Sequence, residues 1–141
     1  MRTVVDTSAL VALHIPEKLS EYIRDQIEKS EEYHFLDLIY YEFTNVIRKR
    51  VARGEISERE AKEILKNGYE LISNSTVHEG KEVIIEAYEM GLKYSITVYD
   101  ASLVALANKI NGKVLTTDLK LLSSLKNTQL YSIFLVGDEV S

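Results

Sequence analysis

Short apolar runs alternate with longer amphipathic segments along this chain of 141 residues. The short runs are rich in β-branched residues, whereas the longer segments repeat apolar residues three and four positions apart, as helices do. Strands that alternate with helices form βαβ units, whose right-handed crossovers give a parallel sheet covered on both faces. The sequence therefore predicts a three-layer α/β/α fold around a central, mainly parallel sheet of four to five strands.

Five runs are candidate strands: residues 3–5, 34–36, 73–77, 113–118 and 132–136. The third of these is polar for a central strand. Seven segments are candidate helices: residues 7–14, 17–29, 37–53, 57–72, 81–90, 97–110 and 119–125. Asp37 is a plausible N-cap, Ser57 and Glu60 match a capping box, and Gly54 and Gly91 would end the helices before them.

Composition and sequence patterns limit where in the cell the protein can be and which class of protein it can belong to. Hydrophobic residues make up 45% of the chain and charged residues 28%, an ordinary globular balance. We find no apolar stretch of membrane-spanning length and no signal-peptide pattern at the N-terminus. We therefore expect a single domain over residues 1–141, located in the cytoplasm and without membrane contact. The net charge of −5 argues against a surface that binds nucleic acid throughout.

The residue types also limit the available chemistry. The chain has no cysteine, which excludes disulfides, zinc-thiolate sites and thiol nucleophiles. Its three histidines, His14, His34 and His78, share no metal-ligand spacing, and we expect each at the surface or at its boundary. Carboxylates and hydroxyls remain as the groups that could carry a reaction.

Four acidic residues stand where a parallel sheet would gather them. Asp6 in VVDTS and Asp118 in VLTTD each end a strand-like run before a helix, so both should lie at the carboxyl edge of the sheet. Asp100 opens a helix, and Glu42 lies between aromatic residues in the first turns of another. Each Asp could instead be a helix cap or a favourable charge at a helix dipole, and Glu42 could simply extend to solvent.

Convergence of all four acids would require a cation. Two carboxylates about 4 Å apart repel by about 4 kcal/mol at an effective dielectric constant near 20, so four cannot all remain ionised alone. Oxygen ligands without histidine or cysteine favour a hard ion, Mg²⁺ or Mn²⁺. Such an ion lowers the pKa of bound water and neutralises charge on a phosphoryl oxygen, as in metal-dependent nucleases.

The order of these acids resembles the PIN-domain ribonucleases, in particular the VapC-type toxins of toxin–antitoxin pairs. The resemblance rests on VVDTSALVAL, YYEFTNVIRKR, YDASLVALA and VLTTDLKLL and covers essentially the whole chain. It implies a PIN fold and a metal-dependent endoribonuclease whose catalytic and metal-binding residues are Asp6, Glu42, Asp100 and Asp118. The resemblance also implies an RNA substrate, a cognate antitoxin and a homodimer.

Several polar residues could support the four acids. Hydroxyl groups at Thr7 or Ser8 could orient Asp6, and Thr116 could do the same for Asp118. Asn45 lies three positions after Glu42, so the two side chains share a helix face and could hydrogen-bond.

Two surfaces could contact RNA or a partner. Cations cluster at the end of the third expected helix, at Arg48, Lys49, Arg50 and Arg53, although such a run also suits a solvated helix C-terminus. An apolar face within residues 17–29 could serve a homodimer, although core packing is its commoner use: Leu19, Tyr22, Ile23 and Ile27.

Two other functions agree with parts of the pattern. A catalytically silent PIN-like module that binds RNA or protein would use the acids only as caps. A phosphoryl-transfer switch resembling a response-regulator receiver also needs Mg²⁺ and Asp residues at strand ends. The receiver pattern, an acidic pair after the first strand and a phosphorylated Asp after a middle strand, is not visible here.

Overall fold

Four parallel strands form the central sheet of the computed structural model, which describes residues 1–135. They are β1 (Arg2–Val5), β2 (Glu32–Leu36), β3 (Thr76–His78) and β4 (Lys113–Leu115), in the order β3-β2-β1-β4. Both neighbours of β1 pair with it in parallel register, β2 through Val4↔His34 and β4 through Val4↔Val114. The predicted parallel α/β sheet is confirmed.

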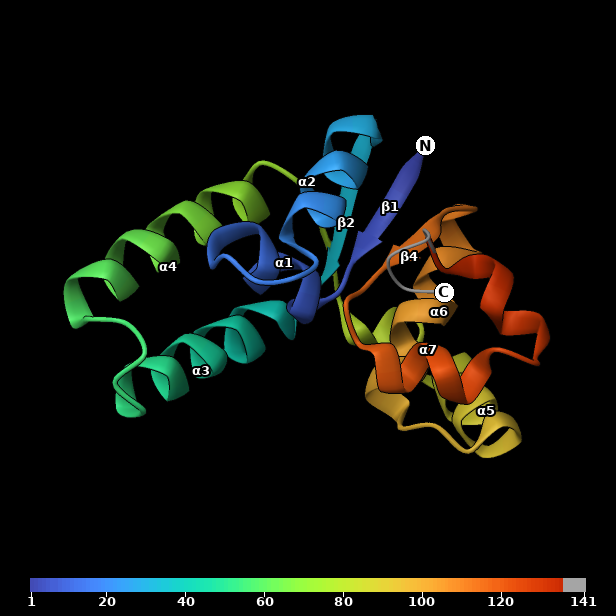
Figure 1. Cartoon of the computed structure of the whole chain (residues 1–141). Helices are drawn as coiled ribbons and strands as arrows, with labels where there is room; N and C mark the ends of the chain where they lie inside the picture. Colours follow the sequence, from blue (N-terminus) through green and yellow to red (C-terminus); the bar gives the residue numbers. More distant parts are fainter. Residues whose placement is uncertain (136–141) are drawn as a thin grey trace.

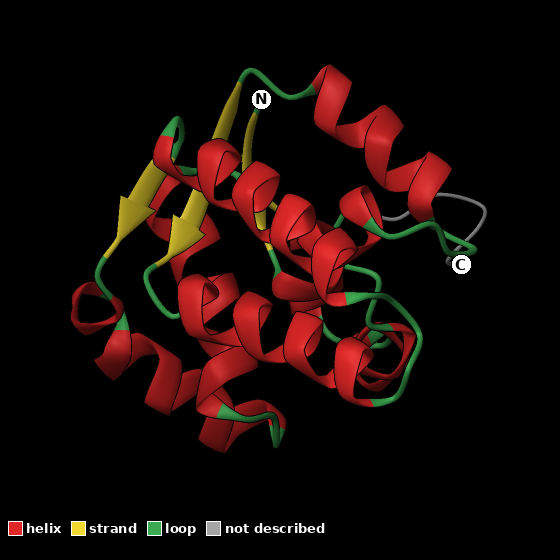
Figure 2. Cartoon of the chain, turned by 90° about the vertical axis from the view of Figure 1, so that its left-hand side faces the viewer, coloured by secondary structure: helices red, strands yellow, loops and turns green. Residues whose placement is uncertain are grey.

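Helices cover both faces of this sheet (Figure 1). One layer holds α1 (Thr7–His14), α2 (Ser20–Lys29), α3 (Ile39–Ala52) and α4 (Glu58–Ser73). The other holds α5 (Ile84–Tyr94), α6 (Val98–Ile110) and α7 (Leu119–Leu125), with the 3₁₀ turns Gly80–Glu82 and Gln129–Ile133. Figure 2 shows the same arrangement after a quarter turn.

Strand alternation explains why there are two hydrophobic cores. Successive side chains of a strand point to opposite faces. Val4 accordingly packs with the α5–α7 layer and Val5 with the α1–α4 layer, while Val114 and Leu115 divide in the same way. The three-layer α/β/α arrangement follows from this alternation.

Three strand predictions need correction. Residues 73–77 are strand only from Thr76, and β3 is an edge strand, which explains its polar composition. The strand expected at residues 113–118 ends at Leu115, because the following residues form the loop before α7. For the last strand, residues up to 133 form a 3₁₀ turn, and Phe134 makes one parallel bridge to Val114. Residue 136 of that prediction lies outside the described residues.

Helix boundaries differ where a distant segment intervenes. Asp37 does not cap α3, because its side chain accepts a hydrogen bond from Gly80 N instead (3.3 Å). Gly91 lies inside α5, which continues to Tyr94 and ends at Ser95 in the left-handed conformation (φ 56°). A Cβ at Gly91 would lie 2.9 Å from Ile96 O, so this glycine allows the tight turn. The capping box of Ser57 and Glu60 and the position of Gly54 after α3 are confirmed.

The apolar face around α2 is used in the core. Leu19, Tyr22 and Ile23 are buried, and Ile27 packs against the same cluster. Within residues 1–135, no helix combines the length and the apolar character needed to cross a membrane.

One histidine expectation is wrong. His34 on β2 is buried, and its two ring nitrogens lie 2.9 Å from His78 Nε2 and 3.0 Å from Glu32 Oε1. A buried imidazole needs partners for both nitrogens, and the edge strand β3 supplies one of them. Sequence spacing does not reveal the pair because residues 34 and 78 meet only through sheet pairing.

Replacement of Gly68 by Ala should destabilise the protein. Gly68 is buried in α4, and a Cβ there would overlap the Phe43 ring, within 2.7 Å of Cζ. The helix would gain about 1 kcal/mol in propensity, but overpacking against a fixed ring costs about 1–3 kcal/mol. We expect a net loss of unfolding free energy in urea denaturation. A variant more stable than the parent would contradict this packing.

Candidate active site

The carboxyl edge of the sheet gathers the predicted acids from four elements. Asp6 follows β1 directly, and Asp118 comes three residues after β4. Glu42 lies in the first turn of α3, and Asp100 in the first turn of α6. Three of them, Asp6, Glu42 and Asp100, line one groove of about 420 Å³.

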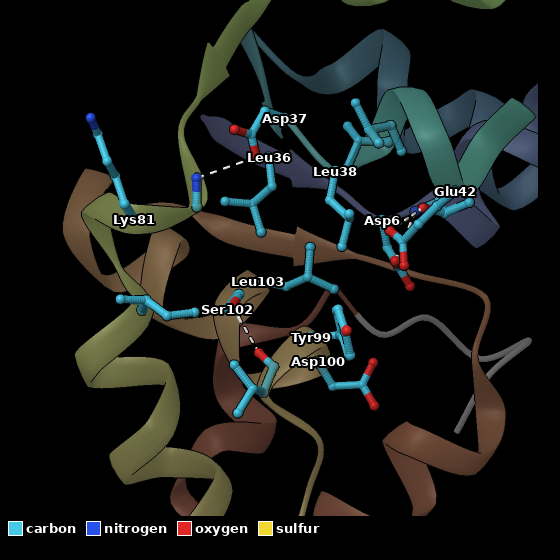
Figure 3. A pocket seen from close by; sticks show the side chains of 16 residues that line it. Asp6, Leu36, Asp37, Leu38, Glu42, Lys81, Tyr99, Asp100, Ser102 and Leu103 are labelled. Atoms are coloured by element: carbon cyan, nitrogen blue, oxygen red, sulfur yellow. Dashed lines mark hydrogen bonds between the residues drawn. The ribbon is translucent and has the colours of Figure 1, made fainter.

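The groove separates the acids into two groups. Figure 3 shows Asp6 and Glu42 on one side and Asp100 on the other, with the carboxylate of Asp100 facing the same space. Asp118 is not among the residues that line the groove, but its negative charge acts on Asp100. The sequence prediction that these acids share one edge is thus met, with Asp118 in a more peripheral place.

Asp6 is the most strongly held of the four. Its Oδ1 accepts from Thr7 N (2.7 Å), and its Oδ2 accepts from Thr116 Oγ1 (2.7 Å) and Ser8 Oγ (3.1 Å). Burial raises the pKa of Asp6 to about 6; these hydrogen bonds oppose the shift, and the charge of Glu42 adds to it. The carboxylate is therefore fixed in orientation and costly to ionise.

A small hydroxyl network joins Asp6 to the loop after β4. Ser8 Oγ and Thr116 Oγ1 lie 3.0 Å apart, and each accepts from a backbone amide, Thr117 N and Asp118 N respectively. Ser8 supports Asp6 as predicted. Thr116 contacts Asp118 only by accepting from its backbone amide, and the Thr116 hydroxyl donates a hydrogen bond to Asp6, because Thr116 follows the β4 residues that pair with β1.

Glu42 takes its hydrogen bond from a different residue than helix spacing indicates. Thr7 Oγ1 donates to Glu42 Oε1 (2.9 Å), so α1 positions this exposed carboxylate. Asn45 directs its side-chain oxygen to Arg48 Nε (2.9 Å) and thus pairs along the exposed side of α3.

Asp100 and Asp118 influence each other electrostatically. Burial raises the pKa of Asp100 above its usual range, the nearby charge of Asp118 raises it further, and a hydrogen bond with Thr97 opposes both. Asp100 does not cap α6: Thr97 does so by accepting from the amide of Asp100 (3.1 Å). Asp6 and Asp118 do act as caps, of α1 and α7, so for them the structural role coexists with any chemical one.

The donor set suits a hard divalent cation. The acids offer only oxygen atoms as ligands. The pKa values of Asp6 and Asp100 are raised, and a bound cation would lower them again by favouring the ionised carboxylates. The described side chains do not close a ready cage of three histidine or acidic ligands. Mg²⁺ needs no such cage, because it usually keeps several waters and binds one or two carboxylates. The residues therefore fit Mg²⁺ or Mn²⁺.

The cationic run at the end of α3 is only partly free. Arg50 lies 3.7 Å from a Glu17 oxygen and 3.3 Å from a Glu55 oxygen, and Arg48 holds Asn45. Lys49 and Arg53 are exposed. Arg50 therefore has a structural role that its position in a basic run does not reveal.

Sequence reasoning did not identify the rest of the groove. Its walls include Leu38 just before α3, Ile84 from α5, and Val98 and Tyr99 from α6. Lys81 lies at the end away from Asp6 (Figure 3). The available signal was weak: an aromatic residue directly before Asp100 in VYDAS. These segments are distant in the chain, and only the fold brings them together.

Comparison with known proteins gives the family. The sequence model of the PIN domain matches residues 3–125. Ribonuclease VapC3 of Pyrobaculum aerophilum is 43% identical over 121 residues, which cover 86% of this chain and 92% of that protein. Ribonuclease VapC1 of Mycobacterium tuberculosis is 31% identical over 118 residues, 84% of this chain and 86% of that protein.

Solved structures agree on the fold. The crystal structure of PAE2754 from Pyrobaculum aerophilum matches with a TM-score of 0.67 and 27% identity, covering 88% of this chain and 79% of that one. A toxin–antitoxin complex from Klebsiella pneumoniae matches with a TM-score of 0.66 and 13% identity, over 91% and 93% of the two chains. The chain belongs to the PIN-domain family and, within it, to the VapC proteins.

Proposed function

We propose that this chain is a VapC-like toxin, an endoribonuclease that hydrolyses RNA phosphodiester bonds with Mg²⁺ or Mn²⁺. The observation that carries the proposal is the groove in which Asp6, Glu42 and Asp100 face one space, with Asp118 close enough to raise the pKa of Asp100. The 43% identity to a protein named ribonuclease VapC3 supports the same reaction.

The residues have separate roles in this proposal. Asp6, Asp100 and Asp118 would hold the cation, directly or through its bound waters, and the cation would supply positive charge to a phosphoryl group and acidify water. Glu42 joins them or accepts a proton from the attacking water, and Thr7 keeps its carboxylate in place through the 2.9 Å hydrogen bond. Ser8 and Thr116 fix the Asp6 carboxylate, so that its oxygens need not reorient during the reaction.

An antitoxin and a second copy of the chain are the proposed partners. The toxin–antitoxin complex from Klebsiella pneumoniae supports an antitoxin, which would cover the groove or insert a side chain into it. Within the basic run at the end of α3, Lys49 and Arg53 are exposed and could contact RNA phosphate or an acidic partner.

Metal binding should be visible as a change in thermal stability. We expect Mn²⁺ to raise the melting temperature of the parent by mass action, and to raise that of Asp100→Asn much less. Without metal, the variant should melt above the parent, because it lacks the charge that Asp118 repels. Melting curves at increasing Mn²⁺ concentration measure both effects. Equal shifts in the two proteins would exclude Asp100 from the metal site.

Cleavage of RNA is the direct test of the proposed function. Purified parent protein with Mn²⁺ should cut members of a panel of structured and single-stranded RNAs, and Asp118→Asn should cut at least about a hundred-fold more slowly. A catalytically silent module would leave every RNA intact while still binding a partner. Cleavage that persists unchanged in Asp118→Asn would indicate a contaminating nuclease.

A further inference from the structure

The groove extends beyond the acidic centre, into a region that the chemistry of phosphodiester hydrolysis does not use. Most of the side chains that line it there are apolar: Leu38, Ile84, Val98 and Leu103. Asp37 and Ser102 also line this part, and the Asp37 side chain accepts a hydrogen bond from Gly80 N. A hydrated divalent cation needs oxygen ligands and water, and gains nothing from such walls. The volume of about 420 Å³ falls in the range of sites that hold a small organic group.

An exposed aromatic ring stands at the junction between the two regions. Tyr99 directly precedes Asp100 in the first turn of α6, lines the groove, and is 65% exposed. Figure 3 shows Tyr99 beside Asp100, across the cleft from Asp6 and Glu42. An exposed ring at this position offers an open face to whatever lies next to the acids.

The far end of the apolar region holds a positive charge. Among the described residues that line the groove, Lys81 is the one cation, and Figure 3 shows it at the end opposite Asp6. Its ammonium group lies 3.0 Å from Glu79, and both side chains are largely exposed, at 80% and 62%. Such an exposed ion pair is weak, so Lys81 is available to another anion.

We propose that this region binds one unpaired nucleotide of the RNA, adjacent to the cleaved phosphodiester, with its base stacked on Tyr99. The inference rests on the proposed function, because it takes the acidic end of the groove as the place of the cleaved phosphate. A nucleotide within an RNA strand has a base with a flat apolar face, and its sugar is joined to a phosphate on each side. The groove presents the matching sequence of acidic centre, aromatic and apolar wall, and cation.

This arrangement predicts a preference for single-stranded RNA. Proteins that recognise RNA strands stack unpaired bases on aromatic side chains, and base-paired nucleotides keep their faces stacked on each other. Lys81 would contact the phosphate on the far side of the bound nucleotide. Tyr99 and Lys81 are therefore positioning residues for the substrate, while the four acids carry the chemistry.

The test compares Tyr99→Leu with Tyr99→Phe and with Tyr88→Leu. Leucine keeps apolar volume but removes the ring, and phenylalanine keeps the ring. Tyr88 on α5 is similarly exposed, at 58%, and does not line the groove. Binding is measured by fluorescence anisotropy with a short labelled RNA strand of random sequence in Mg²⁺, with each change introduced into Asp118→Asn to prevent cleavage.

We expect Tyr99→Leu to weaken binding at least about five-fold, and Tyr99→Phe and Tyr88→Leu to stay within about two-fold of their background. In the cleavage assay, Tyr99→Leu on the parent should raise KM far more than it lowers kcat. The Mn²⁺ dependence of its melting temperature should match that of the parent, which shows that Asp100 is undisturbed. Equal binding by Tyr99→Leu and Tyr88→Leu would overturn the proposal.

A salt titration tests the cation. Lys81→Gln should reduce the slope of log affinity against log salt concentration by about 0.7, the value for one phosphate of a single strand. An unchanged slope would overturn the placement of the phosphate at Lys81. If the parent cleaves RNA and Tyr99→Leu behaves as its control, only this inference fails. If Tyr99 and Lys81 govern binding but the parent cleaves nothing, the proposed function fails instead.

Discussion

Replacement of Asp6 by Asn should stabilise the metal-free protein at neutral pH by about 3 kcal/mol while abolishing RNA cleavage. Burial raises the pKa of Asp6 from 3.8 to about 6, and each pKa unit corresponds to about 1.4 kcal/mol. The folded protein thus bears the cost of a charge that the unfolded chain solvates freely. Asparagine keeps the side-chain oxygen that accepts from Thr7 N and has no charge to bury.

The sign of the pH dependence follows from the raised pKa. Below about pH 4, Asp6 is protonated in both states, and ionisation costs the folded state nothing. Between about pH 4 and 6 the folded state binds more protons than the unfolded state, so the unfolding free energy of the parent falls as pH rises. The advantage of Asp6→Asn should therefore be nearly absent at low pH and complete above about pH 6.

Urea denaturation across this pH range, without metal, measures the difference. Asp37→Asn is the matched control, because Asp37 is exposed and its side chain has one described hydrogen bond, which it accepts from Gly80 N. That control should follow the parent at every pH. A variant Asp6→Asn less stable than the parent at pH 7 would mean that the carboxylate stabilises the fold through its three hydrogen bonds.

Removal of the Phe43 ring should have the largest effect on stability among single changes in α3. Phe43 is fully buried and contacts the rings of His14 and Tyr69, at centroid distances of 5.9 and 6.3 Å, as well as Gly68. Truncation of a buried Phe to Ala costs about 3–5 kcal/mol through lost transfer energy and the cavity left behind. We expect Phe43→Ala to lose that much unfolding free energy in urea.

The neighbouring aromatic residue provides the comparison. Tyr41 lies two positions earlier on α3 and is 78% exposed, so Tyr41→Ala should change the unfolding free energy by less than about 0.5 kcal/mol. Phe43→Ala should also impair cleavage, because the buried Phe43 ring directly follows Glu42 and packs the helix that carries the Glu42 carboxylate against the core. Similar stabilities for the two variants would contradict the packing of α3 described here.

Local patterns were sufficient to predict the layers and the place of most acids. The alternation of Val4 and Val5 across the sheet, and the strand-to-helix change at Asp6, are written in adjacent residues. Because the carboxyl ends of parallel strands lie at the same edge of a sheet, the sequence alone could predict that Asp6 and the segment of Asp118 lie near each other. The single-domain extent and the chemical roles of the four acids stay predictions.

Contacts between distant segments escaped the same reasoning. Asp37 looked like a helix cap, but its partner Gly80 lies beyond β3, which pairs with the strand just before Asp37. Asn45 seemed to face Glu42, but Thr7 occupies that place because α1 packs against α3. The groove beside the acids is lined by residues from strands, helices and a 3₁₀ turn that are far apart in the sequence, so no single segment shows its pattern.

The strand order has a consequence for how the protein is made. β1 lies between β2 and β4, and Asp6 N donates to Leu115 O across the second pairing. Synthesis runs from the N-terminus, so one edge of β1 remains unpaired until the segment of β4 has been added. Asp100 is made shortly before that segment, and Asp118 after it. The hydroxyl of Thr116 reaches Asp6 only then. If the four acids act as proposed, a nascent chain that ends at α4 lacks two of them and cannot cleave RNA, including the message that encodes it.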